Sequence, residues 1–265
     1  MWQPQLKALT ARWRVLSLRY TRPRGTDAPK AAYTLDQLAD DAQALLRALG
    51  IQRTHWVGPL DGRHDRSDAR AQSAGALREP HSLRYIEPDS ARGQALWDER
   101  IHTAETKGMD PLVEGTLSRW FTTPFKERGG AVVETVRGMI RSTPPAGYIG
   151  CCQAISGLNL TDRIGAIKAP TLIIVGEDDQ GTPVAASRVM NERIQGSQLV
   201  ILTSAAHLSN MEQPDAFTSA PDRLPGQGQL ARARTFRNRL TDLRVDVLTG
   251  PGPGRSLSGQ TSRPR

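Results

Sequence analysis

Three titratable side chains stand where they could act together as a proton relay: Asp178, Asp179 and His207. The aspartates directly follow the apolar run 172–175, and the histidine follows a second apolar run, 198–202, in a turn of small residues. A carboxylate that orients an imidazole allows it to act as a general base toward a hydroxyl nucleophile. Asp179 is the predicted acid, with Asp178 ranked second, and His207 is the predicted base.

The elements around these residues favour a parallel sheet. The run Leu172 to Val175 is bounded by Pro170 and Gly176 and is apolar throughout, as expected of a strand buried on both faces. A helix is predicted over 184–193 and a second strand over 198–202. Open α/β sheets carry their catalytic groups beyond the carboxyl ends of the strands, so the acid and the histidine are expected at one sheet edge.

A nucleophile is missing from the place where this arrangement needs one. An α/β-hydrolase turns from strand to helix through G-x-S-x-G, which lifts a serine hydroxyl above the sheet. Here Gly58-Pro-Leu-Asp-Gly62 has both glycines at that spacing, with Leu60 in the position of the serine and Asp61 as the candidate backbone donor to an oxyanion. Ser67 and Ser73 lie in a polar, Arg- and Asp-rich segment that has no hydrolase motif.

The rest of the chain divides into four predicted parts. Residues 1–95 form the N-terminal part of the core, with helices ending near Leu9 and spanning 33–49, and strands over 14–20 and 54–58. Residues 96–160 form a helical cap, because their apolar residues recur at helical spacing without a strand pattern. Residues 161–217 complete the core and carry the acid and the histidine. Residues 218–265 are expected to be a disordered tail rich in Arg, Pro and Gly.

Composition favours a cytoplasmic protein without nucleic-acid or membrane partners. The net charge is +8, but nine Arg and three Asp place +6 of it in residues 218–265, leaving about +2 for the rest. No aromatic platform accompanies these charges. The two cysteines, Cys151 and Cys152, are adjacent and imply no disulfide framework, which favours a reducing compartment. No apolar run reaches the roughly eighteen residues of a membrane span, and the N-terminus lacks the apolar core of a signal peptide.

Several segments together resemble the 3-oxoadipate enol-lactonases, a family of α/β-hydrolases. They cover most of residues 1–217 and comprise Asp27-Ala-Pro-Lys-Ala-Ala-Tyr-Thr-Leu-Asp-Gln-Leu-Ala-Asp-Asp41, Tyr148-Ile-Gly-Cys-Cys152, Leu158-Asn-Leu-Thr-Asp-Arg-Ile164 and the Gly176 and His207 motifs. The resemblance implies an α/β-hydrolase core with a helical cap, and hydrolysis of an enol-lactone to 3-oxoadipate in the breakdown of aromatic compounds. It also implies that no metal or organic cofactor takes part. Asp179 and His207 occupy the family's acid and base positions.

The sequence departs from the family in three places. By this resemblance, the first strands and one oxyanion loop are expected to be missing. Thr21-Arg-Pro-Arg-Gly25 replaces an R-G-H-G loop, and Leu60 replaces the serine. One hypothesis accounts for the last two: several segments are translated out of frame. An allowed choice of codons for residues 60–71, read one base later, gives S-M-G-G-M-I-G-Q-T-L-A after a leucine from Pro59, which forms G-L-S-M-G-G. With codons chosen in the same way, the shift converts residues 21–25 to R-G-H-G and residues 220–225 to R-L-T-D-F-L.

Two alternatives stay open beside a 3-oxoadipate enol-lactonase acting on a small lactone. One is a hydrolase of another carboxylic ester or lactone, because cap residues set specificity. The other is a catalytically dead α/β-hydrolase-like protein that uses its cleft for binding. The residue at position 60, in the turn after Gly58, distinguishes an enzyme from a binding protein: a serine favours the enzyme, whereas a true Leu60 favours binding or a non-functional product.

Overall fold

The computed structural model describes residues 1–16, 34–51, 54–55, 57, 79–81, 91–156 and 162–223. Residues 1–233 form one compact unit, and residues 234–265 form a second that lies outside the described residues. The predicted elbow, with Gly58, Leu60, Asp61 and Gly62, also lies outside them, as does the loop 21–25. None of the helices in the described part of the chain has the length and apolarity needed to cross a membrane.

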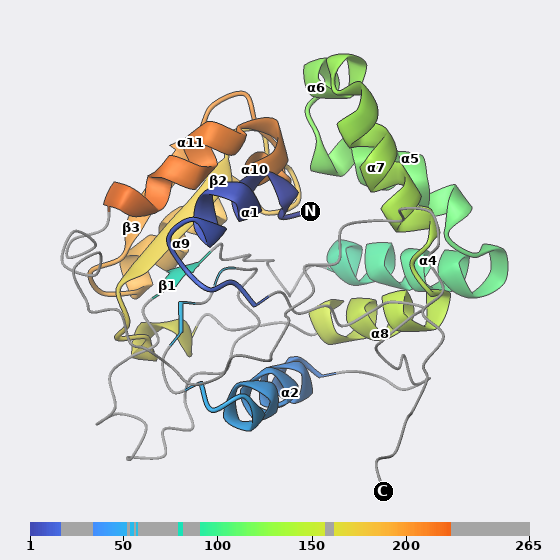
Figure 1. The fold of residues 1–265 in the computed structure, drawn as a ribbon. Helices are drawn as coiled ribbons and strands as arrows, with labels where there is room; N and C mark the ends of the chain where they lie inside the picture. The colour runs from blue at the N-terminus through green and yellow to red at the C-terminus, as the bar shows by residue number, and fades with distance from the viewer. Residues whose placement is uncertain are drawn as a thin grey trace, which may run out of the picture. The chain divides into compact units, whose positions relative to one another are not determined.

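A parallel sheet forms the centre of the core (Figure 1). Its three described strands are β1 (Glu79–His81), β2 (Thr171–Gly176) and β3 (Gln198–Leu202), in the order β1-β2-β3. β2 is buried along its whole length, and the register pairs Leu172 with Gln198 and Gly176 with Leu202. Helix α9 (Val184–Arg193) connects β2 to β3. The sequence therefore predicted these two strands and this helix correctly, and the α/β class is confirmed.

The N-terminal strands were predicted less well. Arg14 to Leu16, at the start of the predicted strand 14–20, have no strand structure, and neither have Thr54, His55 and Val57. Within the described residues, β2 instead pairs on that side with β1, at Glu79–Thr171 through His81–Ile173. An apolar run forms a strand only where it can pair with a neighbouring strand, and the sequence of the run does not show whether such a neighbour is present.

Helices α4 to α8, referred to below as the cap, bear out the helical prediction for this part. They are joined through the short 3-10 helix η1, and their bounds are α4 (Ala91–Lys107), η1 (Asp110–Leu112), α5 (Val113–Trp120), α6 (Thr123–Arg128), α7 (Gly130–Arg141) and α8 (Pro145–Ser156). Their apolar faces make one buried cluster that includes Leu117, Phe121 and Val136. The same cluster contains Leu208, the residue after His207, so the cap packs directly on the histidine turn.

The N-terminal helix packs against the two helices that follow that turn. Helix α1 (Gln3–Thr10) lies against α10 (Ser209–Glu212) and α11 (Pro214–Ser219), as Figure 1 shows. The Trp2 ring is 5.9 Å from that of Phe217, and buried Gln5 donates to the carbonyl of Asn210 at 2.8 Å. The predicted start of the disordered tail at 218 was too early. The chain stays helical to Ser219 and continues as η3 (Ala220–Arg223), because Ala220 is buried beside Phe217.

The remaining described helices are α2 (Leu35–Ala48) and η2 (Ile164–Ala166). Thr34 caps α2 at its N-terminus, where its hydroxyl accepts from the backbone N–H of Gln37 at 3.1 Å. Gly50 ends the helix with a φ of +65°, a conformation that glycine adopts without strain.

Gly176, at the end of β2, is packed too closely for any side chain. A methyl group there would lie 2.2 Å from the carbonyl oxygen of Ala206 and 2.3 Å from that of Ala205. Both are backbone atoms of the turn before His207, so no rotamer change can relieve the clash.

We therefore expect Gly176→Ala to lower the free energy of unfolding by about 3 kcal/mol. Gly138→Ala is the matched control, because Gly138 is exposed inside α7 with no atom near its added methyl group, and alanine should gain about 1 kcal/mol there. Urea unfolding followed by circular dichroism measures both. Equal stability of the two variants would contradict this packing.

Candidate active site

The ends of β2 and β3 meet through backbone hydrogen bonds. Glu177 N–H donates to the carbonyl of Leu202 and Asp178 N–H to that of Ala205, both at 2.9 Å. Asp179 N–H turns back to the carbonyl of Gly176 at 3.2 Å. These bonds bring the residues after β2 beside the residues after β3, as the parallel-sheet argument predicted.

Asp179 is buried, with 6% of its surface exposed, and its carboxylate accepts four hydrogen bonds. Oδ1 accepts from the N–H groups of Gly181 and Thr182, both at 2.9 Å. Oδ2 lies 2.7 Å from the Thr182 hydroxyl and 2.8 Å from Nδ1 of His207. Burial alone would raise the pKa of Asp179. The hydrogen bond and charge of His207, together with the bonds from Thr182, outweigh burial and lower this pKa below its ordinary value.

His207 is oriented from two sides. Because Nδ1 faces Asp179, Nε2 is the ring nitrogen in position to take a proton from a nucleophile. The ring stacks with that of Trp120, at a centroid distance of 6.4 Å and an interplanar angle of 23°. The N–H of Leu208 donates to the carbonyl of Trp120 at 2.9 Å, which holds the turn against the end of α5.

The lowered pKa makes the contribution of Asp179 to stability depend on pH. That contribution is present above the ordinary aspartate pKa of about 3.9 and is lost as the pH falls through the lower value of the folded state. The destabilisation caused by Asp179→Asn should therefore be largest near neutral pH and should shrink below about pH 4. Urea unfolding at a series of pH values measures it, with exposed Asp178→Asn as the control. A penalty for Asp179→Asn that stays constant into acid would contradict this coupling.

The structure brings together Asp179 and His207 and separates them from the other candidates. Asp178 is exposed, and its carboxylate takes no part in the pair. Among the remaining histidines, His55 lies edge-on to Trp13 and His102 is exposed on α4. Cys152 is buried and Cys151 half-buried, and burial raises the pKa of the Cys152 thiol, in keeping with a packing role.

Sequence reasoning missed three residues around the pair. Thr182 supports the carboxylate, Trp120 covers the imidazole, and buried Glu212 bonds the backbone just before the histidine. Trp120 belongs to the apolar residues of the predicted cap, whose spacing indicates packing and not a place beside the imidazole. A weak signal existed for Thr182, which comes three residues after the acid in a Gly-Thr-Pro turn.

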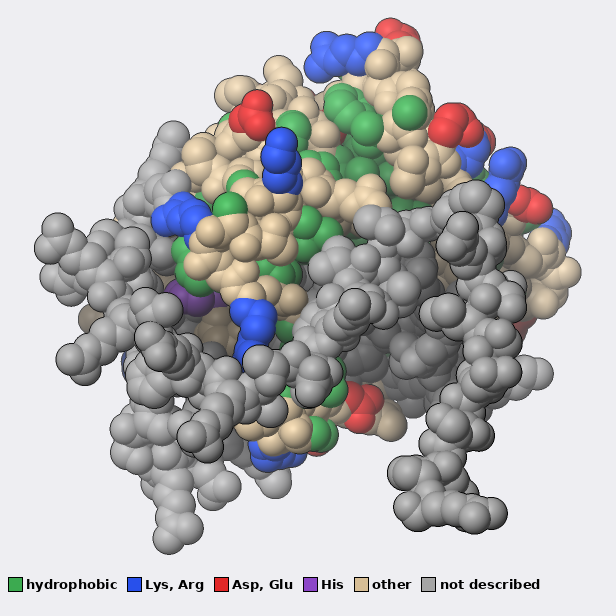
Figure 2. Space-filling view, viewed as in Figure 1, with side chains coloured by type: hydrophobic (Ala, Val, Ile, Leu, Met, Phe, Trp, Pro, Cys, Tyr) green, Lys and Arg blue, Asp and Glu red, His purple; other side chains and the backbone are tan. Residues whose placement is uncertain are grey.

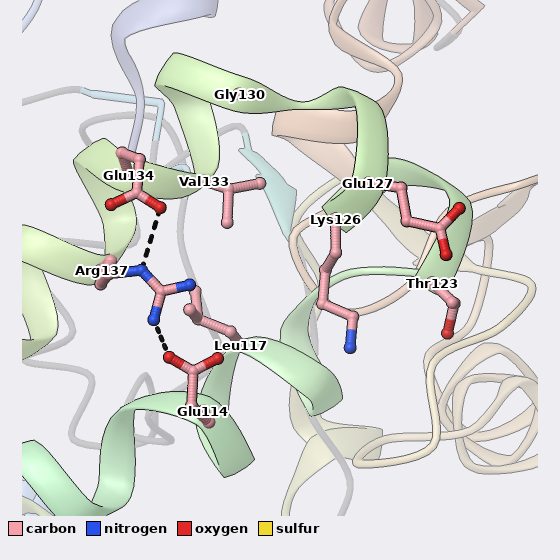
Figure 3. A pocket seen from close by; sticks show the side chains of 9 residues that line it. All are labelled: Glu114, Leu117, Thr123, Lys126, Glu127, Gly130, Val133, Glu134 and Arg137. Carbon is pink, nitrogen blue, oxygen red and sulfur yellow. Dashed lines mark hydrogen bonds and ion pairs between the residues drawn. The ribbon is translucent and has the colours of Figure 1, made fainter.

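The hollow in Figure 3 is a separate feature of the cap. It measures about 380 Å³ and lies between α5, α6 and α7. Arg137 on its wall is paired with Glu114 and, at 3.0 Å, with Glu134. Neither Asp179 nor His207 lines this hollow.

Two observations concern possible ligands: the distribution of surface charge and the placement of side chains that could bind a metal ion. On the face in Figure 2, Lys and Arg side chains lie singly among Asp and Glu side chains over the described residues. Within the described residues, no group of three His, Cys, Asp or Glu side chains is placed to hold a metal ion.

Comparisons with solved structures define the class of protein. The chain is similar to the crystal structure of the enol-lactonase from Burkholderia xenovorans LB400, at 33% identity and a TM-score of 0.72 over 83% of this chain and 84% of that one. It is also similar to a thermophilic esterase from Thermogutta terrifontis, at 25% identity and a TM-score of 0.70 over 83% and 82%. With its parallel sheet and acid–histidine pair, the protein is an α/β-hydrolase.

The comparison with curated proteins identifies the family. The 3-oxoadipate enol-lactonase 1 of Acinetobacter baylyi is 30% identical over 223 residues, which cover 82% of this chain and 80% of the relative. The chain therefore belongs to the 3-oxoadipate enol-lactonase family, whose members are hydrolases that act on a lactone or carboxylic ester. No protein-family model matches the sequence.

Proposed function

We propose that the enzyme from which this sequence derives hydrolyses a carboxylate-bearing enol-lactone, 3-oxoadipate enol-lactone, through a serine, His207 and Asp179. We further propose that the serine has been lost from the printed sequence, where Leu60 occupies its position. The observation that carries the proposal is the part-buried 2.8 Å hydrogen bond between Asp179 Oδ2 and His207 Nδ1 at the ends of adjacent parallel strands. The names of the relatives supply the substrate.

The chemistry would follow from this geometry in two stages. In the first, Nε2 of His207 takes the proton of the serine hydroxyl while the serine oxygen attacks the lactone carbonyl. The ester oxygen of the lactone ring then leaves as an enol, which receives this proton from His207. In the second, water attacks the acyl-serine with His207 again as base, which releases the acid and restores the serine. The backbone N–H of the residue after the nucleophile, position 61, which is Asp61 in the printed sequence, would stabilise the oxyanion. Leu60 has no hydroxyl for the first stage.

The reading-frame hypothesis supplies the missing group. Below, the frame-restored chain means the product in which residues 21–25, residues 59–75 and the segment from 220 onward are translated one base later. It carries G-L-S-M-G-G in place of the printed turn. The serine then follows residues 54–58, the segment predicted as a strand, and an apolar segment replaces the charged one after it.

Resequencing the coding DNA over codons 15–95 and across codon 218 tests this hypothesis. We expect single-base insertions or deletions, relative to DNA that encodes the printed sequence, upstream of the elbow and near codon 218. DNA that encodes Leu60 and its neighbours as printed would contradict it, and the alternative of a catalytically dead, ligand-binding relative would then be favoured.

Two cap arginines support a substrate that bears a carboxylate. Arg119, on the same helix as Trp120, is half-buried and donates to the Thr116 hydroxyl at 3.1 Å, and the Arg100 guanidinium stacks over Trp97 at 4.7 Å. Burial and the nearby charge of Arg100 lower the pKa of Arg119. Among the residues that the structure describes, no carboxylate forms an ion pair with either arginine. Two adjacent cations without an anionic partner are suited to bind an anionic ligand.

We therefore expect Arg119→Gln to weaken binding of adipate, a dicarboxylate, by roughly tenfold or more, since a hydrogen bond to a charged group is lost. Titration calorimetry of the printed chain, meaning the protein with the sequence as printed, measures the adipate affinity without catalysis. Arg128→Gln removes an exposed cation of α6 and should bind adipate as before. Equal adipate affinity in Arg119→Gln and the parent, or equal binding of the neutral dimethyl ester, would contradict a carboxylate subsite.

Hydrolysis of another carboxylic ester is the second candidate, favoured by the likeness to the thermophilic esterase. A substrate panel for the frame-restored chain separates the two. The first proposal predicts faster turnover of the anionic enol-lactone than of neutral aryl esters. The second predicts the reverse order.

A further inference from the structure

Glu212 makes an unusual set of contacts for an acidic residue. It ends α10 with 7% of its surface exposed, and its two carboxylate oxygens accept three hydrogen bonds. Oε1 accepts from the N–H and the hydroxyl of Thr122, at 2.9 and 2.8 Å, although the two residues are ninety positions apart. Oε2 accepts from the N–H of Ala206 at 2.5 Å.

The Glu212 bonds, together with a backbone bond from Leu208, connect the cap to both neighbours of the histidine. Thr122 precedes α6 as its N-cap, where its hydroxyl also accepts from the N–H of Phe125 at 3.3 Å. Ala206, on one side of His207, is held by Glu212. Leu208, on the other side, is held by the carbonyl of Trp120. The cap segment 120–122 therefore bonds the histidine turn at two points, and the Trp120 ring stacks on the imidazole between them.

A carboxylate is the side chain that these contacts require. Burying an acid is costly unless hydrogen bonds compensate, and no cation pairs with Glu212 among the described residues. Three donors converge on it, so an acceptor-only group with two oxygens satisfies all of them. Glutamine has the same shape but turns an NH₂ group toward at least one of these donors, which leaves that donor without an acceptor.

We propose that Glu212 is a positioning residue, which holds the His207 ring against Asp179 by fixing the histidine turn to the cap segment 120–122. The orientation of the imidazole and the placement of the cap are then coupled through one buried side chain. The structural part of this proposal holds whether or not the chain has a nucleophile. Its catalytic consequence rests on the proposed function.

The structural part is tested on the printed chain by NMR. The signal of the His207 Nδ1 proton, assigned by its loss in His207→Gln, reports how well the ring is held against Asp179. We expect Glu212→Gln to raise the solvent-exchange rate of this proton by about tenfold or more, because the turn loses a hydrogen bond to a charged group. Asp215→Asn, which removes an exposed acid three residues on, should leave the rate unchanged.

Thr122 provides an independent variant should Glu212→Gln fail to fold. Thr122→Val removes the hydroxyl and should also accelerate exchange, Thr122→Ser should retain the parent rate, and the double variant with Glu212→Gln should add little to the single ones. An unchanged rate in folded Glu212→Gln, or in Thr122→Val if the former does not fold, would overturn the proposal.

The catalytic consequence is measured in the frame-restored chain. There Glu212→Gln should lower kcat about a hundredfold, as expected for a misplaced base, with a smaller change in KM. A rise in KM alone would overturn a role in positioning the base. If the frame-restored parent is itself inactive, the proposed function fails, while the exchange rates still decide the role of Glu212.

Discussion

Restoring the reading frame at the elbow is expected to turn a chain without detectable hydrolysis into an active hydrolase. The printed chain has Leu60 where the mechanism needs a hydroxyl, while Asp179 and His207 are already 2.8 Å apart. Loss of the nucleophile from a serine relay costs roughly a million-fold in kcat, so the frame-restored chain should gain by about that factor. Release of acid from the enol-lactone, followed by pH-stat titration, measures both chains.

A matched variant separates the serine itself from its setting. Leu60→Ser in the printed sequence gives G-P-S-D-G followed by Arg63, His64 and Asp65, without the small apolar helix start that an elbow requires. We expect this variant to remain near background, because the hydroxyl is present but not presented above the sheet. Full activity of Leu60→Ser alone would contradict the frame hypothesis, and inactivity of a folded frame-restored chain would contradict the proposed relay.

Removal of the base is expected to have an effect of similar size. In the frame-restored chain, His207→Gln should lower kcat by roughly a million-fold, and Asp179→Asn by roughly ten-thousand-fold. The aspartate costs less because it orients the imidazole and stabilises its charged form but does not itself transfer the proton. Since the residues act as a unit, the double variant should be little worse than His207→Gln alone.

Asp178→Asn is the control for this series. Its carboxylate is exposed and lies one residue from the acid, so the substitution changes the same local charge without touching the imidazole. Activity within about twofold of the parent is expected, as for a surface change away from the site. A loss as large as that of Asp179→Asn would move the acid role to Asp178.

Much of the core could be predicted because its signals are local. β2 contains the unbroken apolar run 172–175, bounded by Pro170 and Gly176, and the observed bounds of α9, 184 and 193, are those predicted. α2 begins after an N-cap residue, Thr34. β1 could not be predicted, because three residues show no periodicity and Pro80 lies in their middle. A proline is tolerated in a strand at a sheet edge, and within the described residues β1 has a neighbour on one side only.

The same distinction applies to the site. The proximity of Asp179 and His207 could be predicted because each follows a strand, and parallel strands bring their ends to one edge of the sheet. Trp120 could not be, because it reaches the histidine turn from a helix that is distant in the sequence. Glu212 could not be, because its contacts with the cap depend on Thr122, ninety positions away. Their types, an aromatic at helical spacing and an acid before a proline-containing segment, are also those of ordinary packing and surface residues.

Covalent labelling tests most directly whether the acid–histidine pair serves a lost serine. Both chains would be treated with a fluorophosphonate, which reacts with serines activated by a histidine base, and analysed by intact mass and peptide mapping. The account predicts one phosphonyl group on the restored elbow serine, its loss in His207→Gln, and no label on the printed chain. Label on the printed chain at Ser67 or Ser73, or none on a folded frame-restored chain, would contradict it.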